Sequence, residues 1–179
     1  MAIDKVVSAS ITTDAVGPTQ LNEASNYAFT GTVTGAGESN IPYFDVKPSS
    51  NIAYTDNTSH IIQFATVNKD TASGFNNSTY KYTVQSGQAG QYVINFGFRM
   101  NPTDCNRASC GLKLNDVAFQ TVETDGGGGS TYASASSSIL MTLAVSDVLH
   151  LTYYQNSSVN SVLRTDGTYF SGFKLTSTT

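Results

Sequence analysis

The sequence predicts an all-β protein, built as an antiparallel sandwich or jelly roll. Ten Tyr and nine Phe occur without any Trp, and the chain has little of the Ala-Leu-Glu-Lys periodicity that is typical of helices. Short runs of alternating apolar and polar residues recur along the chain, and Gly, Asn, Asp and Ser separate them. So many short strands favour two packed sheets.

The alternating runs can be followed in order along the chain. Each is expected to place its apolar side chains on one face of a strand: Tyr80, Tyr82 and Val84; Tyr92, Ile94, Phe96 and Phe98; Leu112 and Leu114, then Val117 and Phe119; Ile139, Met141, Leu143 and Val145; Leu149, Leu151 and Tyr153; Tyr169, Phe173 and Leu175. A turn at 88–90 is expected to join the first two runs. An Asn115-Asp116 turn is expected to close the third run into a hairpin.

Length and charge limit what the protein can be. A chain of 179 residues is long enough for one well-buried domain with a small appendage. The net charge of −4 and the lack of a basic stripe argue against nucleic acid as a partner. No apolar run approaches ~20 residues, so no membrane insertion is expected. The start of the chain does not read as a secretory signal, which indicates synthesis in a cytoplasm.

The first forty residues differ in character from the rest. Their scattered apolar residues, which include Val6, Ile11, Val16 and Leu21, stand in a background of Ser, Thr and Asp. These are too few to build an independent core, so residues 1–40 are expected to form an extended arm that needs a partner surface. Residues 41–179 are then expected to form the folded head.

Two blocks of the sequence have a particular spacing. The first block places aromatic residues, one Asp and one Gly at set intervals: Phe64, Asp70, Phe75, Tyr82, Gly90, Tyr92 and Phe96. The second comprises Asp147-Val-Leu-His-Leu151 and Tyr169-Phe-Ser-Gly-Phe-Lys-Leu175. Together they resemble the globular heads of the complement-q family, which share a trimeric jelly roll with tumour necrosis factor. The chain departs from that pattern by two extra residues before Gly90, by Ile94 in place of Phe, and by Ser146 in place of Gly.

The resemblance implies an antiparallel jelly-roll head that assembles as a homotrimer. In such trimers, aromatic and aliphatic side chains of one sheet of each copy pack around a threefold axis. The candidates here for the trimer interface are Tyr92, Phe96, Phe98, Tyr153 and Phe173. The alternative is that all five belong to the core of a single chain.

The arm has a resemblance of its own. Thr13-Asp14-Ala-Val16, with Thr19-Gln-Leu21 and Phe29-Thr-Gly-Thr-Val33, resembles N-terminal and linker segments of tailed-phage fibre proteins. That likeness implies a virion-surface protein, made in the host cytoplasm, whose arm attaches to other virion proteins. The expected function is that of a homotrimeric tail fibre or appendage whose head binds a glycan or protein of the host surface. The alternatives are a capsid-decorating cement trimer and a free carbohydrate- or ligand-binding module.

Receptor contacts are expected in exposed loops. Asp125-Gly-Gly-Gly-Gly-Ser130 continues into Tyr132, and a second polar loop spans Asn156–Asn160. Residues of these two loops, Asp125, Tyr132, Asn156 and Asn160, are the candidate receptor contacts. Loops rich in Ser, Asn, Gly and Tyr suit polar, adaptable contacts.

The residues of the chain do not indicate a catalytic function. His60 and His150 have no evident nucleophile beside them, and none of the common catalytic or phosphate-binding motifs is present. The carboxylates are few and scattered, so neither a glycosidase pair nor a metal site is expected. Asp70 is expected to be a turn or capping residue. No enzyme activity, cofactor or metal is predicted.

The two cysteines offer two interpretations. Cys105 and Cys110 are separated by four residues, which is wider than a redox Cys-x-x-Cys motif, and no second pair suggests zinc. They are expected to be two loop thiols or to close a small loop as a disulfide.

Overall fold

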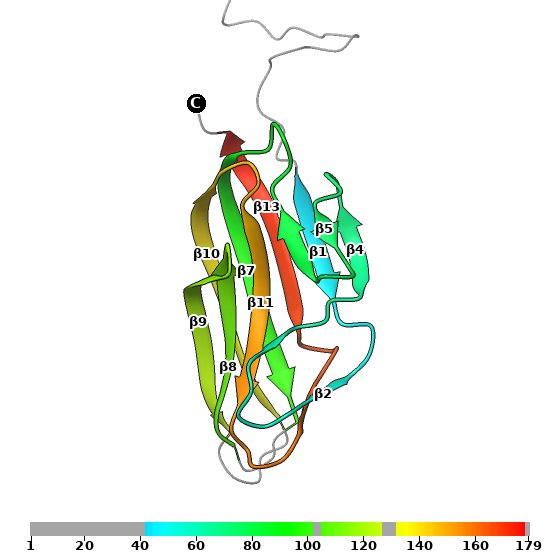
Figure 1. Cartoon of the computed structure of the whole chain (residues 1–179), viewed down its shortest axis with the longest axis vertical. Helices are drawn as coiled ribbons and strands as arrows, with labels where there is room; N and C mark the ends of the chain where they lie inside the picture. Colours follow the sequence, from blue (N-terminus) through cyan, green and yellow to red (C-terminus); the bar gives the residue numbers. More distant parts are fainter. Residues whose placement is uncertain (1–41, 102–104, 127–131, 178–179) are drawn as a thin grey trace, which may run out of the picture. The chain divides into compact units, whose positions relative to one another are not determined.

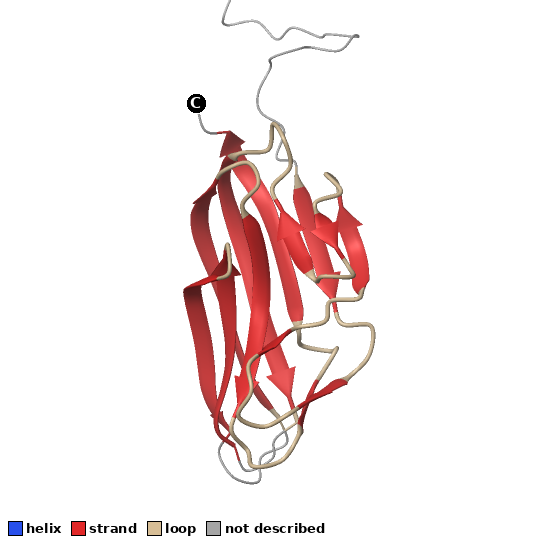
Figure 2. Ribbon diagram, viewed as in Figure 1, coloured by secondary structure: helices blue, strands red, loops and turns tan. Residues whose placement is uncertain are grey.

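In the computed structural model, every regular element of the described residues is a β-strand (Figure 2). The structure describes residues 42–101, 105–126 and 132–177. The arm candidates Val6, Ile11, Val16 and Leu21 lie outside the described residues. All strand pairs are antiparallel, which confirms the predicted all-β, antiparallel jelly-roll sandwich.

The strands form two sheets (Figure 1). The first is seven-stranded, with the order β2-β12-β7-β13-β1-β4 and with β10 paired to β7. Its strands are β1 (Tyr43–Lys47), β2 (Ile52–Tyr54), β4 (Thr66–Asp70), β7 (Gly90–Met100), β10 (Ala133–Leu143), β12 (Ser161–Leu163) and β13 (Tyr169–Ser177). The second is six-stranded, with the order β5-β6-β11-β8-β9 and with β3 paired to β11. Its strands are β3 (His60–Ile61), β5 (Phe75–Asn76), β6 (Lys81–Thr83), β8 (Cys105–Leu114), β9 (Val117–Gly126) and β11 (Val148–Gln155).

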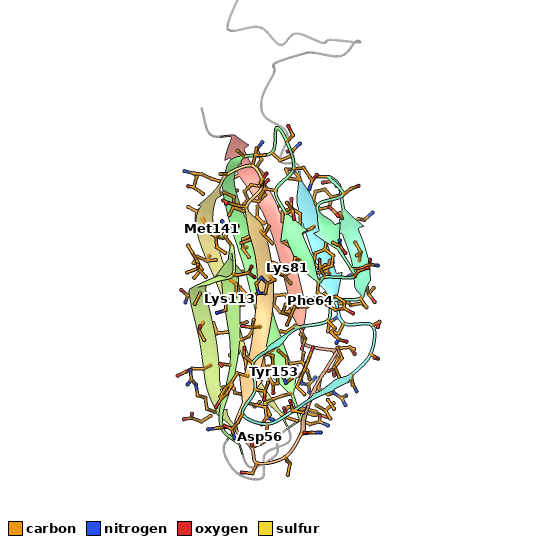
Figure 3. The ribbon with its side chains drawn as sticks, in the orientation of Figure 1. Asp56, Phe64, Lys81, Lys113, Met141 and Tyr153 are labelled. Atoms are coloured by element: carbon orange, nitrogen blue, oxygen red, sulfur yellow. The ribbon has the colours of Figure 1, made fainter. Side chains whose placement is uncertain are left out.

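Aromatic side chains fill the space between the sheets. The largest fully buried side chains are Tyr82, Tyr92, Tyr153, Phe44, Phe64, Phe96, Phe98 and Phe170. The ring of Phe44 stacks on that of Tyr82 at 4.1 Å, and Phe98 meets Tyr153 edge to face at 5.6 Å. Phe64 and Tyr153 are labelled in Figure 3. Burial of this much aromatic surface is the main force that holds the two sheets together.

Several predicted elements are confirmed. Tyr92, Ile94, Phe96 and Phe98 share the buried face of β7, as their period-two spacing requires. Strands β8 and β9 form the predicted hairpin. Its turn residues Asn115 and Asp116 have φ of 52° and 66°, the pair of positive values that a type I′ turn needs.

Three local predictions are wrong. Tyr80 is not part of a strand: its φ is 59°, its N–H donates to the Asn76 carbonyl at 2.7 Å, and β6 begins after it. Val145 lies beyond the end of β10 and is exposed, because residues 144–147 form a turn. The turn before β7 lies at 86–87, where Gly87 has a φ of 75°.

The cysteines are not in a loop. Both lie in β8, and Cys110 is a free, buried thiol. The Cα atoms of residues five apart in a strand are about 17 Å from each other, which is too far for a disulfide. Burial raises the pKa of the Cys110 thiol, so the reactive thiolate is disfavoured.

The predicted role of Asp70 as a turn residue is confirmed. Its Oδ1 accepts a hydrogen bond from the Gly74 N–H at 3.2 Å, and its Oδ2 accepts one from the Phe75 N–H at 2.8 Å. These bonds close the loop between β4 and β5. A Cβ on Gly74 would lie only 2.6 Å from the Thr83 carbonyl oxygen, so the loop also needs a glycine here. The spacing between Asp70 and Phe75 in the sequence is therefore explained by a hydrogen-bonded turn.

Asp70→Ala is expected to lower the free energy of unfolding by about 1–3 kcal/mol, because it leaves two partly buried N–H groups without their acceptor. Urea denaturation followed by circular dichroism measures this change. Asp70→Asn is the control, since it keeps one side-chain acceptor and should lose less. Equal stability of wild type and Asp70→Ala would contradict the role given to the carboxylate.

The structure also explains the pattern of the second sequence block, at residues 147–151 and 169–175. A Cβ on Gly172 would lie 2.6 Å from Ile94 Cδ1 and 2.7 Å from Phe44 Cε1, so only glycine fits at that point of β13. Ser146 has a φ of 72°, the left-handed region where glycine is favoured. Asp147 Oδ2 accepts a hydrogen bond from the Ala144 N–H at 2.8 Å, which holds the turn despite that substitution.

Candidate functional site

The outward face of the seven-stranded sheet carries an apolar row that crosses four strands. Tyr43 of β1 is paired with Phe173 of β13, Phe173 with Val93 of β7, and Val93 with Leu140 of β10. Directly opposed residues share a face of the sheet, so these four side chains form one continuous row. Tyr43, Phe173 and Leu140 are 38%, 37% and 57% exposed in the single chain.

Beyond the apolar row, the same face is lined mainly by small polar side chains, and Asp45 of β1, paired with Ser171, adds a carboxylate. Ser171 of β13 is paired with Asn95 of β7, and Asn95 with Ser138 of β10, whose hydroxyl donates to Asn95 Oδ1 at 2.7 Å. Further along lies Tyr169, paired with Gly97; a Cβ on Gly97 would lie 3.0 Å from the Tyr169 ring. A face with exposed aromatic rings and small neighbours allows close approach of another flat surface.

The sandwich has two distinct ends. The described chain begins at Pro42, whose carbonyl accepts a hydrogen bond from Lys174 near the end of β13. Strand β7 runs from this level to Met100, about 33 Å for eleven residues. We call the end of the sandwich at which β7 ends the distal end (Figure 1). Ala133 of β10 and Leu163 of β12 are both paired with Met100 and lie there too.

A charged cluster lies at the distal end. Arg99 Nη1 donates to Asp166 Oδ2 at 2.7 Å, and Arg164 Nε lies 3.4 Å from Asp166 Oδ1. The exposed ring of Tyr132 lies beneath both guanidinium groups, 3.9 Å from Arg99 Cζ and 5.4 Å from Arg164 Cζ. Gly167 makes room, since a Cβ there would lie 2.6 Å from Arg99 Cβ. We name Arg99, Tyr132, Arg164 and Asp166 the distal cluster.

The four predicted receptor-contact residues lie at this end. Tyr132 belongs to the distal cluster, and Asp125 is exposed near the end of β9. Asn156 follows β11 and its N–H donates to the Arg107 carbonyl at 3.1 Å, while Asn160 is exposed. Residues 127–131 of the glycine loop lie outside the described residues. Whether these residues contact a receptor stays a prediction.

Sequence reasoning missed the two arginines of the distal cluster. Arg99 is separated from its partner Asp166 by 67 residues, and no local pattern links them. The signal that could have pointed to these arginines is the composition of the chain. Only 12% of the residues are charged, so each arginine is a candidate for a specific role.

The predicted trimer-interface residues divide into two groups. Tyr92, Phe96, Phe98 and Tyr153 are completely buried in the core of one chain, the alternative that the sequence left open. They have no surface to offer to a neighbouring copy. Only Phe173 is exposed, within the apolar row.

A buried imidazole lies beneath charged groups on the six-stranded sheet. His150 Nδ1 has no hydrogen-bond partner among the described residues and lies 3.8 Å from Asp116 Oδ1. Lys81 Nζ donates to the same Asp116 oxygen at 2.7 Å. Burial, followed by the nearby Lys81 ammonium, lowers the pKa of His150 despite the opposing effect of Asp116, and Lys113 adds to the lowering. The hydrogen bond from Lys81 lowers the pKa of Asp116.

This arrangement makes stability depend on pH through His150. In the unfolded chain the imidazole takes up a proton near pH 6.5, whereas the folded chain resists protonation until a lower pH. The unfolded state therefore binds more protons in that interval, and stability is expected to fall as the pH drops below about 6.5. Urea denaturation at several pH values, for wild type and His150→Gln, tests this. A variant with the same pH slope as wild type would contradict it.

The described residues contain no group of three His, Cys, Asp or Glu side chains that could hold a metal ion. None of the elements in the described ranges is a helix that could cross a membrane.

Comparison with known proteins concerns the fold. No protein-family model and no curated protein matches the sequence. The globular domain of zebrafish complement 1qA matches with a TM-score of 0.58 and 17% identity, over 77% of this chain and 100% of that one. Murine APRIL matches with a TM-score of 0.59 and 12% identity, over 74% and 98% of the two chains. Eiger TNF from S. frugiperda matches with a TM-score of 0.54 and 12% identity, over 76% and 92%. The chain therefore has the jelly-roll fold of complement-q and tumour-necrosis-factor domains.

Proposed function

We propose that this chain is the trimeric head of a tailed-phage fibre or virion appendage, and that it acts by binding the host surface rather than by catalysis. The apolar row formed by Tyr43, Phe173, Val93 and Leu140 is the observation that carries the assembly. Three of its members are more than one-third exposed in the single chain, side by side on one sheet face. Such a patch on a chain with abundant polar surface favours a protein partner.

The partner we assign to this face is further copies of the same chain. The resemblance to complement-q heads implies threefold packing through one sheet of each copy. The seven-stranded sheet supplies the surface that such packing needs: an apolar row with small polar side chains beside it.

The two ends of the sandwich support a display role. Residues 1–41 join the described chain at one end of the long strands, and the distal cluster lies at the other, about 30 Å away by strand length. Three copies around an axis would present three distal ends in the same direction. Weak contacts made by three sites together give the avidity needed on a dense host surface.

Placement on a phage rests on the arm. Its likeness to fibre linker segments supports attachment to other virion proteins, with Val6, Ile11, Val16 and Leu21 as the apolar contacts. The protein would then be located on the virion surface.

Two measurements test the proposal. Light scattering of the full chain is expected to give the mass of three copies, and antibody labelling of intact particles is expected to mark a tail appendage. The labelled full chain should also bind host cells and compete with phage adsorption. Labelling confined to the capsid would favour the cement trimer instead, and release of oligosaccharide from host envelopes would overturn the binding role.

A further inference from the structure

A shallow groove of about 270 Å³ lies on the outward face of the six-stranded sheet. It is lined by Ser59, Arg107, Ser109, Gly111, Lys113, Ala118, Thr121, Thr152 and Tyr154. Most of these residues come from β8, β9 and β11, on the opposite side of the sandwich from the apolar row. The groove is therefore separate from the proposed assembly face.

The centre of the groove is hollow because its side chains are short. Thr152 of β11, Gly111 of β8 and Thr121 of β9 are directly paired across the three strands. A Cβ on Gly111 would lie 3.0 Å from Thr152 Oγ1 and 3.6 Å from Thr121 Oγ1, so even alanine would crowd this position. Longer side chains rise on either side: Tyr154 and Arg107 towards one end, and Lys113 towards the other.

Hydroxyl groups line the hollow. Ser109 is 94% buried as a residue and lines the groove. Thr152 Oγ1 donates to the Gly111 carbonyl at 3.3 Å, and Tyr154 donates to Asn57 Oδ1 at 3.0 Å, so both oxygens still accept. Hydroxyl oxygens with remaining acceptor capacity on the wall of a groove can hydrogen-bond to the polar groups of a ligand.

The charges of the groove are positive in a chain of net charge −4. Its lining contains one Arg and one Lys and no carboxylate. Arg107 is paired with Glu123 at 2.9 Å, which lies just outside the lining. Lys113 of β8, labelled in Figure 3, forms no ion pair with any described residue. The ammonium of Lys113 is thus the group of this groove that can meet an anion.

We propose that this groove binds one pyranose ring of an acidic saccharide, with the sugar carboxylate on Lys113. Hydroxyls that both donate and accept match sugar hydroxyls, and the short floor at Gly111 and Ala118 fits a flat ring. This proposal names the class of ligand for the host-binding role proposed above. It rests on that role only in taking the host surface as the source of the saccharide.

The experiment uses the full chain and two methyl glycosides, one of glucuronic acid and one of glucose. Chemical-shift titration is expected to move the amide signals of Ser109, Gly111 and Lys113 with the glucuronide. Loss of a charged hydrogen bond costs roughly tenfold or more in affinity, so the glucoside should bind at least about tenfold more weakly.

Lys113→Gln should reduce glucuronide binding by the same factor. The matched control is Lys69→Gln, an exposed lysine on β4 of the other sheet, which should bind as wild type does.

A second variant blocks the groove by volume. Ala118 is exposed on β9, so Ala118→Phe fills the hollow without disturbing the core, and it should abolish binding while the urea transition is unchanged. Equal binding of glucuronide and glucoside, unchanged affinity in Lys113→Gln, or signal changes away from the groove would each overturn the assignment. If the glucuronide does not bind but the chain still binds host cells, the groove proposal fails and the host-binding role stands. If the glucuronide binds as expected but no host cell does, the host-binding role fails and the groove stands.

Discussion

Phe170→Ala is expected to lower the free energy of unfolding by about 3–5 kcal/mol, which is a large part of the stability of a domain of this size. Phe170 is completely buried on the inward face of β13. Its ring lies 4.9 Å from that of Phe44 and 5.8 Å from that of Phe64. Alanine would leave a cavity that three strands with fixed hydrogen-bond register cannot close.

Urea denaturation followed by far-ultraviolet circular dichroism measures the loss. The matched control is Phe119→Ala, because Phe119 is 46% exposed on β9 and the chemical change is identical. The control is expected to cost less than about 1 kcal/mol, in line with surface substitutions. Similar losses in both variants would show that Phe170 does not have the central place in the core that the contacts indicate.

The part of the fold that local pattern determines was predictable from the sequence. The grouping of Tyr92, Ile94, Phe96 and Phe98 on one face of β7 follows from the period of the strand, and the β8–β9 hairpin follows from Asn115-Asp116, two residues that tolerate positive φ. The spacing from Asp70 to Phe75 is a local hydrogen-bonded turn. In each case the cause lies within a few residues of the effect.

The choice of face in β13 was not predictable in this way. Alternation groups Tyr169 with Phe173, and Phe170 with Gly172, but it does not say which group meets the core. Both groups contain a phenylalanine, and the register with β1 and β7 decides that Phe170 points inward. For the same reason, alternation alone could not show that four aromatic residues proposed for the trimer interface are core residues of one chain.

The distal cluster and the groove depend on contacts between distant segments. Arg99 meets Asp166 only because β7 and β13 are neighbours in the sheet. Gly111 creates a hollow only because Thr152 and Thr121 flank it from two other strands. Such sites require the strand order, which a single sequence shows only through resemblance.

Leu140→Asp is expected to convert the proposed trimer into folded monomers. Leu140 is 57% exposed in the single chain, so aspartate there costs the monomer little. In the assembly the same carboxylate would be buried against apolar side chains without a partner, three times in each trimer. A cost of about 3 kcal/mol per site already weakens an association by more than a hundredfold. Sedimentation velocity over a wide range of protein concentrations measures the shift.

The interpretation depends on a matched control on the other sheet. Val117 of β9 is 69% exposed and lies away from the apolar row, so Val117→Asp adds the same charge and should leave the trimer intact. Both variants should keep the wild-type circular dichroism spectrum, since neither side chain is part of the core. Dissociation by Val117→Asp but not by Leu140→Asp would move the assembly face to the six-stranded sheet, where it would cover the groove. If the wild-type chain sediments as a monomer at every concentration, the trimer proposal is wrong. The avidity expected from three displayed distal ends is then lost as well.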